Sequence, residues 1–262
     1  MTHPHGGTGG ALLLVVGLAI GYEVLTLLAG GGRPWNPWRG TSFMTGCALL
    51  VLALAPGQPT GFPSHVRQHL IVGMLAPTAL VMGAPVTLLL RGLPTAAARR
   101  LARILHLPAV RLLTHPVTAL ILSSGSLAAL HVTALYTWTT TEPALHDVVL
   151  AHFLLSGLLF AWVIAGPDPA PRRPSVRYRL VVLAAAILTH AVLSQLLYAG
   201  VVGDSAVPPA ERRAGATLLY YGADAAELLL VVALVTTRPA RRRPVPRVRS
   251  GLPAAVAGRR GR

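Results

Sequence analysis

Seven apolar stretches, separated by short polar segments, limit what this chain can fold into. They cover about residues 11–28, 42–55, 65–90, 115–136, 146–165, 178–200 and 214–237. A helix needs about 20 predominantly apolar residues to cross the hydrocarbon core of a bilayer. Lipid also excludes irregular backbone and open sheet edges, because their polar groups have no partner there. The sequence therefore predicts an all-α fold, a polytopic membrane helix bundle with seven transmembrane helices.

The arginines indicate how these spans are oriented. All 23 basic residues are arginine, and they gather in the segments 29–41, 91–114 and 166–179 and after residue 237. The opposite side of the membrane is left with only three arginines, Arg67, Arg212 and Arg213. Short loops rich in basic residues stay on the cytoplasmic side. The N-terminus is therefore predicted outside and the C-terminus in the cytoplasm, and membrane lipid rather than nucleic acid explains the net charge of +15.

The chain divides into three predicted regions. Residues 1–10 form an outer N-terminal tail, residues 11–237 the seven-helix transmembrane domain, and residues 238–262 a basic cytoplasmic tail whose composition predicts disorder. Within the second region, the segment 94–106 has arginine on one face and leucine or isoleucine on the other, which is typical of a helix lying in the membrane interface. A single cysteine, Cys47, excludes an intrachain disulfide.

The third stretch carries the most informative side chains. His65 and His69 are four residues apart, a spacing that places both imidazoles on one helix face. Imidazole binds copper, zinc, iron and nickel, and the thioether of Met74 further along the stretch favours Cu(I). The alternative is a histidine pair that makes hydrogen bonds at the lipid–water interface. Pro77 and Pro85 each remove a backbone donor, so we expect the helix to kink at both.

The predicted orientation gathers several histidines into one outer layer. His131 lies near the outer end of the fourth span, His146 begins the fifth, and His152 lies about 9 Å deeper at 1.5 Å per residue. Together with His65 and His69 they suggest a metal site in the outer leaflet. His106 and His115 fall on the cytoplasmic side.

A second polar layer is predicted near the middle of the membrane. His190, Asp224 and Glu23 each lie about 15 Å from the outer end of their span, and Glu227 shares a helix face with Asp224. Ionisable groups at this depth should face the bundle interior and pair. His190 with Asp224 or Glu227 is the expected pair. It is either a second metal or proton position or a polar clasp between helices.

Two long blocks resemble a known family. They are SHVRQHLIVGMLAPTALVMGAPVTLLLRGLP, residues 64–94, and AHFLLSGLLFAWVIAGPDPAPRR, residues 151–173. Both are similar to the CtaG-like cytochrome c oxidase assembly factors. The resemblance implies a seven-helix protein of the bacterial plasma membrane that helps to deliver copper to the haem–copper oxidase, with the oxidase subunits as partners. The family's characteristic histidines match His65, His69, His131, His152 and His190.

Three alternative functions are consistent with these features. The first is a non-enzymatic assembly factor that binds copper at the outer histidines and supports its insertion into the oxidase. The second is a haem-binding electron carrier with transmembrane histidine pairs as axial ligands, either His131 with His190 or His69 with His152. The third is a scaffold that binds no metal. No phosphate-binding loop or nucleophile motif points to an enzyme.

Overall fold

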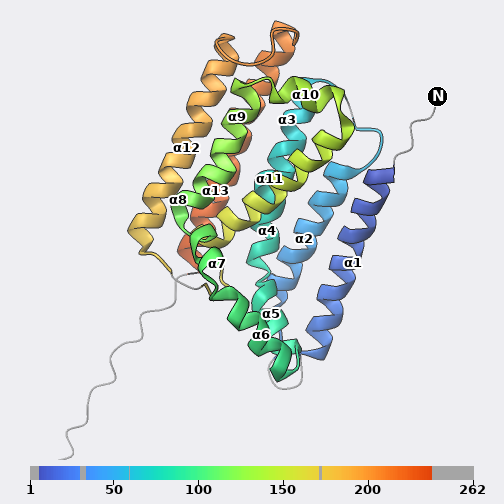
Figure 1. Cartoon of the computed structure of the whole chain (residues 1–262), viewed down its shortest axis with the longest axis vertical. Coiled ribbons are helices and arrows are strands. Elements are labelled where there is room, and N and C mark those ends of the chain that lie inside the picture. Colours follow the sequence, from blue (N-terminus) through green and yellow to red (C-terminus); the bar gives the residue numbers. More distant parts are fainter. Residues whose placement is uncertain (1–5, 30–33, 59, 171–172, 238–262) are drawn as a thin grey trace, which may run out of the picture.

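All regular structure is helical in the computed structural model, which describes residues 6–29, 34–58, 60–170 and 173–237 (Figure 1). The predicted all-α class is therefore confirmed for the described part of the chain. Residues 1–5 of the expected outer tail and the whole expected tail 238–262 lie outside it. The elements are α1 (Gly6–Leu28), α2 (Pro37–Leu54), α3 (Phe62–Leu70), the π-helical turn η1 (Ile71–Leu75), α4 (Ala76–Met82), α5 (Pro85–Gly92), α6 (Thr95–Leu105), α7 (Pro108–Leu113), α8 (Pro116–Leu120), the π-helical turn η2 (Ile121–Gly125), α9 (Ser126–Val132), α10 (Leu135–Thr141), α11 (Pro143–Ile164), α12 (Val176–Ala199) and α13 (Pro209–Thr236).

Length and composition support four membrane-crossing helices in the described residues, or six if each of two bent helix pairs is one span. The four are Gly9–Leu28, α11, α12 and α13. The bent pairs are Phe62–Met82 with α5, at 41°, and Pro116–Val132 with α10, at 80°. The predicted count of seven is not reached by this measure, because the second stretch, α2, begins with the polar sequence PWRGTS.

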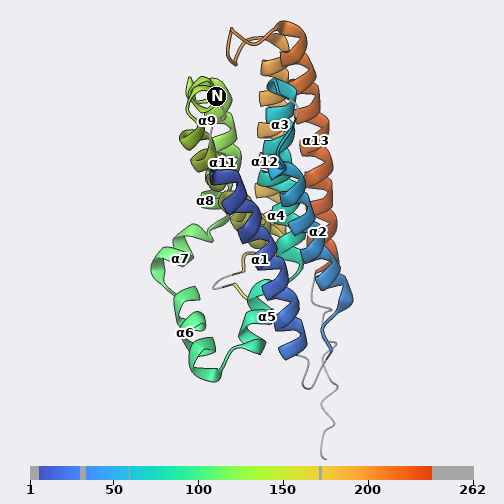
Figure 2. The same cartoon turned by 90° about the vertical axis from the view of Figure 1, so that its right-hand side faces the viewer.

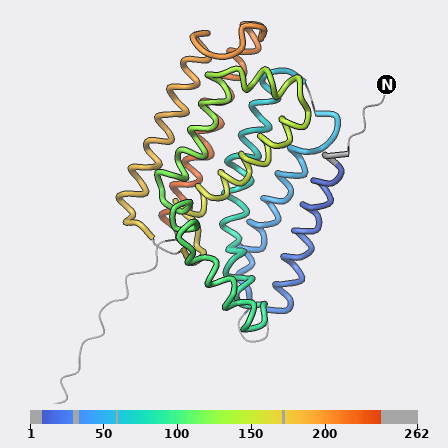
Figure 3. The backbone as a smooth tube through the Cα atoms, in the orientation of Figure 1, coloured from blue at the N-terminus to red at the C-terminus, as the bar shows by residue number. Residues whose placement is uncertain are grey.

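The third predicted span lies at the centre of the bundle (Figures 1 and 3). Its outer part, α3, packs against α13, whereas α4 packs against α2, and α11 crosses both η1 and α4. In the view of Figure 2, α9 and α11 lie on one side and α12, α13 and α3 on the other. Side chains of the third span are therefore close to three other long helices.

A π-helical turn precedes Pro77 in the third predicted span. Because Pro77 has no N–H, it cannot bond to the carbonyl of Gly73 in an α-helix. The structure absorbs this loss as η1, in which Ala76 N–H donates to Ile71 O. The Thr78 hydroxyl donates to the Met74 carbonyl at 2.8 Å. The helix therefore changes type locally just before Pro77, at the place where the kink was expected.

At Pro85 the predicted kink is confirmed. Ala84 adopts a left-handed conformation with φ 53°, and α5 starts anew at Pro85. The buried Asp168 carboxylate caps this helix. It accepts the N–H of Val86 at 3.0 Å and that of Thr87 at 2.7 Å. The loop after α11 therefore fixes the broken inner end of the third span.

The fourth stretch is likewise divided, by η2 and by the sharp bend after Val132. In the expected interfacial segment, α6 and α7 form an arm that extends from the bundle, as Figure 2 shows. Neither helix has a buried residue. An arm outside the bundle with no buried residue fits the amphipathic sequence of the segment 94–106.

Candidate metal centre

Three histidines from two helices meet near the outer end of α3. His65 and His69 lie one turn apart on α3, with ring centroids 4.3 Å from each other. His146, in the first turn of α11, lies 5.4 Å from the His65 ring and 6.2 Å from the His69 ring. One ring nitrogen from each histidine lies within 4.8 Å of the other two. His65 and His69 thus share one helix face, as their spacing predicted, and His146 is the third member of the group.

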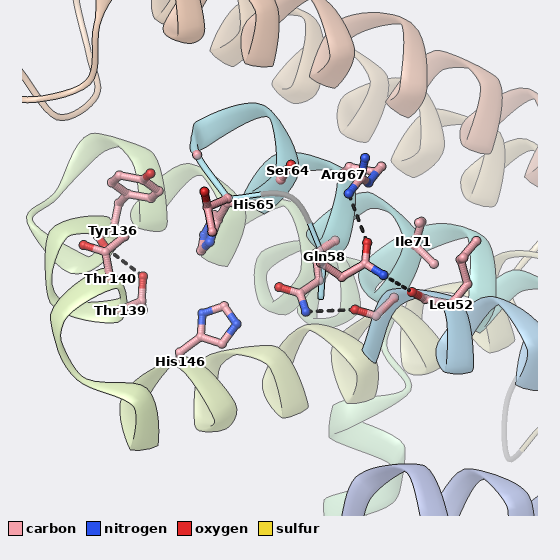
Figure 4. A pocket seen from close by; sticks show the side chains of 14 residues that line it. Leu52, Gln58, Ser64, His65, Arg67, Ile71, Tyr136, Thr139, Thr140 and His146 are labelled. Atoms are coloured by element: carbon pink, nitrogen blue, oxygen red, sulfur yellow. Dashed lines mark hydrogen bonds between the residues drawn. The ribbon is translucent and has the colours of Figure 1, made fainter. Parts of the chain in front are cut away.

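A cavity of about 620 Å³ adjoins this cluster. Figure 4 shows His65 and His146 facing each other across it, with Tyr136 beside them. Hydroxyl and amide side chains and one guanidinium complete the polar part of the wall: Gln58, Thr60, Ser64, Arg67, Gln68, Thr139 and Thr140. His65 and His146 are half-buried, whereas His69 is 4% exposed. His65 and His146 therefore line the cavity, whereas His69 is buried next to them and lines a separate small void.

The imidazole nitrogens are largely unpartnered within the described residues. His65 Nε2 and both nitrogens of His69 are buried without a hydrogen-bond partner. The His69 ring packs edge-on against Phe153, at 4.6 Å between centroids, and that of His65 against Tyr136, at 5.0 Å. A buried polar group without a partner costs about 1–3 kcal/mol. Ring edges held in place with free lone pairs are suited to binding an ion.

Arg67 contributes a guanidinium to the cavity wall, and this group bonds to Gln58 rather than to a histidine of the cluster. Its Nη2 donates to Gln58 Oε1 at 3.1 Å, and Gln58 in turn donates to Leu52 O. In the sequence, Arg67 stands out only as an exception to the basic loops, and Tyr136 belongs to none of the predicted histidine layers. No spacing in the sequence relates either residue to the histidines, because they reach the cavity through the fold.

His131 and His152 do not belong to this three-histidine group. His131, 2% exposed, has Nδ1 3.0 Å from Leu127 O in its own helix. His152 Nε2 lies 3.1 Å from Leu122 O, a carbonyl in the π-helical turn η2. The sequence could not reveal this bond, because it gave no sign of the π turn. His152 thus satisfies a backbone group instead of joining the cluster.

The deeper layer contains one predicted pair. His190 Nδ1 lies 2.7 Å from Glu227 Oε1, and both side chains are buried. Glu227 rather than Asp224 makes this contact, and Asp224 is half-buried. The expectation that Glu23 faces the interior is wrong: it is exposed on α1, where the neighbouring Tyr22 takes the inward position and donates to Gly83 O at 2.8 Å.

Met74 and Met82 do not line the outer cavity. Met74 lines two small voids below the cluster, next to His190. Met82 packs against a different apolar cluster around Phe160 and Leu230. Neither thioether is a ligand of the outer three-histidine group.

Comparison with known proteins identifies the family. The profile of the cytochrome c oxidase caa3 assembly factors matches residues 20–239. Uncharacterized proteins of Mycobacterium bovis and Mycobacterium tuberculosis are each 34% identical over 191 residues, which is 69% of this chain and 28% of theirs. One of Mycobacterium leprae is 34% identical over 194 residues, 70% of this chain and 29% of its own. The chain thus spans less than a third of the length of these relatives, and no solved structure matches it. With its family profile spanning most of the helical domain, the chain belongs to the cytochrome c oxidase caa3 assembly factor family.

Proposed function

We propose that this chain is a non-catalytic membrane assembly factor that binds copper as cargo at His65, His69 and His146 and supports its insertion into cytochrome c oxidase. The observation that carries the proposal is the convergence of three ring nitrogens within 4.8 Å beside a cavity of about 620 Å³. The family supplies the link to the oxidase. The partner is then an oxidase subunit that approaches the cavity.

The donor set favours copper in a low charge state. Imidazole is a good ligand for copper. Within the described residues, His65, His69 and His146 form the one group of three or more His, Cys, Asp or Glu side chains whose ligand atoms all lie within 4.8 Å of one another. No carboxylate lines the adjoining cavity within the described residues. A site without anionic ligands leaves the ion's charge uncompensated, so a monovalent ion requires less charge to be buried than a divalent one.

The proposal includes the membrane arrangement. The chain would cross the bacterial plasma membrane seven times, with α2 and the two bent pairs each counting as one span, the N-terminus outside and the C-terminus in the cytoplasm. The distribution of arginines supports this orientation. It places the histidine cavity on the outer side, where copper for the oxidase would be received.

The haem-carrier alternative has less support. The voids that His190 lines, one of them shared with His131, are about 20 Å³ each, whereas a pocket for a large planar ligand measures some 300 Å³ or more. In the other proposed pair, His152 bonds to Leu122 O. A Soret band in the purified protein would support the haem reading and contradict ours.

Copper analysis of the purified full chain tests the proposal. We expect His69→Ala to lose most of the copper bound by the parent. The control is His106→Ala, because His106 lies at the C-terminal end of α6 and not in the three-histidine cluster. Its Nδ1 lies 2.7 Å from Ala102 O. In cells, the His69 variant should yield an oxidase deficient in copper, which excess copper in the medium restores in part. Equal copper in both variants and the parent would leave the metal-free scaffold as the better account.

A further inference from the structure

Below the outer cluster, two small voids between the long helices share lining residues, among them Met74 and His190. Each has a volume of about 20 Å³. The upper void is lined by His69, His131 and His190, and the lower by His190 and Glu227. A space of about 10–15 Å³ suffices for one water-sized particle. Each void can therefore hold a single ion or water, and His69 lines both the outer cluster and the upper void.

Both voids are bordered by the two π-helical turns. Gly73 and Met74 of η1 and Ser123 of η2 line the upper void and the lower one alike. A π-helical turn inserts one residue into an α-helix and is frequent at functional sites. Two such turns on different helices, facing the same narrow space, place a thioether and a hydroxyl beside the histidines.

Hydrogen bonds fix the ring nitrogens that remain available. A carbonyl oxygen only accepts, so His131 carries its hydrogen on Nδ1 toward Leu127 O and keeps the lone pair on Nε2. Nε2 of His131 is buried and has no partner in the described chain. A carboxylate also only accepts, so His190 likewise donates from Nδ1 to Glu227 and keeps its lone pair on Nε2.

This is the arrangement that metal-binding histidines adopt. A ligating imidazole commonly donates its other N–H to a carboxylate or a backbone carbonyl, which orients the ring and strengthens it as a ligand. His190 has the carboxylate and His131 the carbonyl. The second oxygen of Glu227, a residue 2% exposed, has no partner in the described chain. Its negative charge would favour a cation nearby.

We infer that a second metal position, for Cu(I), lies in the upper void, with His131 Nε2, His190 Nε2 and the Met74 thioether as ligands. The thioether selects the soft monovalent ion. Glu227 acts as a positioning residue that orients His190 and compensates the charge of the ion. His69, which lines both places, is the residue through which an ion would move between the outer cluster and this inner position. The inference rests on the proposed function, since the outer cluster is where the ion would enter.

Copper stoichiometry of the full chain in detergent tests the inner position. Cu(I) is added anaerobically and unbound metal is removed by gel filtration. We expect two copper ions per parent chain and one in Met74→Leu, and X-ray absorption should lose its sulfur scatterer in that variant. Leucine is close to methionine in volume, so the fold should persist. The matched control, Met82→Leu, removes a thioether that packs elsewhere and should keep both ions and the sulfur signal.

Two further variants keep this inference separate from the proposed function. His190→Gln should also retain one ion, whereas His146→Ala should lose the outer ion and keep the sulfur-ligated one. A parent that binds a single ion, lost in His146→Ala and unaffected by Met74→Leu, would overturn the inner position and leave the proposed function intact. Loss of copper only in Met74→Leu and His190→Gln would support the inner position and contradict the outer one. A parent without copper would contradict both.

Discussion

Gly157 of α11 packs directly on the carbonyl oxygen of Gly73 in the π-helical turn. A Cβ at position 157 would overlap this oxygen and would meet the Pro77 ring at 2.9 Å. The carbonyl is the one that Pro77 leaves without an α-helical donor. Absence of a side chain at Gly157 thus allows α11 to approach the altered backbone, which brings His146 on the same helix toward His65.

Gly157→Ala should therefore destabilise the bundle. The added methyl can be accommodated only by moving backbone, and such overpacking costs about 1–3 kcal/mol. The free energy of unfolding in detergent measures the effect. Gly17→Ala is the matched control, since a Cβ there has nothing within 4 Å. Equal stability of the two variants would contradict the close approach.

Removing the cap of α5 should weaken the inner end of the third span. Asp168→Ala deletes the acceptor for the N–H groups of Val86 and Thr87, and loss of a helix cap typically costs about 0.5–2 kcal/mol. Thermal unfolding should show a lower Tm. Glu142→Ala is the control, because Glu142 precedes α11 without a side-chain capping bond. A Tm change of the same size in both variants would argue against a capping role for Asp168.

Two carboxylates in the middle of α13, Glu227 and Asp224, should behave differently. Glu227→Gln alters the buried hydrogen bond to His190, and a polar contact of this kind between membrane helices contributes about 0.6–2 kcal/mol. Asp224→Asn, one turn away and half-buried, should have a smaller effect. The measurement is the free energy of unfolding of both variants. A larger loss in Asp224→Asn would contradict the observed pairing.

Acid should release a contact in the loop between α12 and α13. The Thr137 hydroxyl and the Ala206 N–H both donate to Asp204 and lower the pKa of its carboxyl below 3.8. The carboxylate therefore stabilises the fold at pH values above its unfolded pKa of about 3.9. This contribution disappears as the pH falls through the lower folded pKa.

The Tm difference between the parent and Asp204→Asn, followed from pH 7 to pH 3, should accordingly shrink below about pH 4. Thr137→Val removes the main donor and should reduce the pH dependence. A difference that stays constant down to pH 3 would show that the contact does not stabilise the loop.

Reporter fusions should test the proposed orientation. A reporter fused after Arg238 should be active in the cytoplasm, and one fused after Glu142 should be active outside, because positive loops remain on the inner side. A cytoplasmic signal after Glu142 would place the histidine cavity on the wrong side for receiving external copper.

The amino-acid sequence determined the helical class, the long apolar helices and the shared helix face of His65 and His69. Apolar length and the 3.6-residue period are local properties, and two residues four apart share a face wherever the helix lies. The break at Pro85 was equally local, because a missing N–H acts within one helix turn.

Tertiary structure decided which residues from different helices meet. Each residue along a helix turns the side chain by about 100°, so a partner depends on how each helix is rotated against its neighbours. Packing selected His146 over His131 and His152 for the outer group, and Glu227 over Asp224 for His190. The two π-helical turns differ in this respect. Pro77 shows why η1 forms, but no local signal predicts η2, whose Leu122 carbonyl is bonded by His152 from another helix.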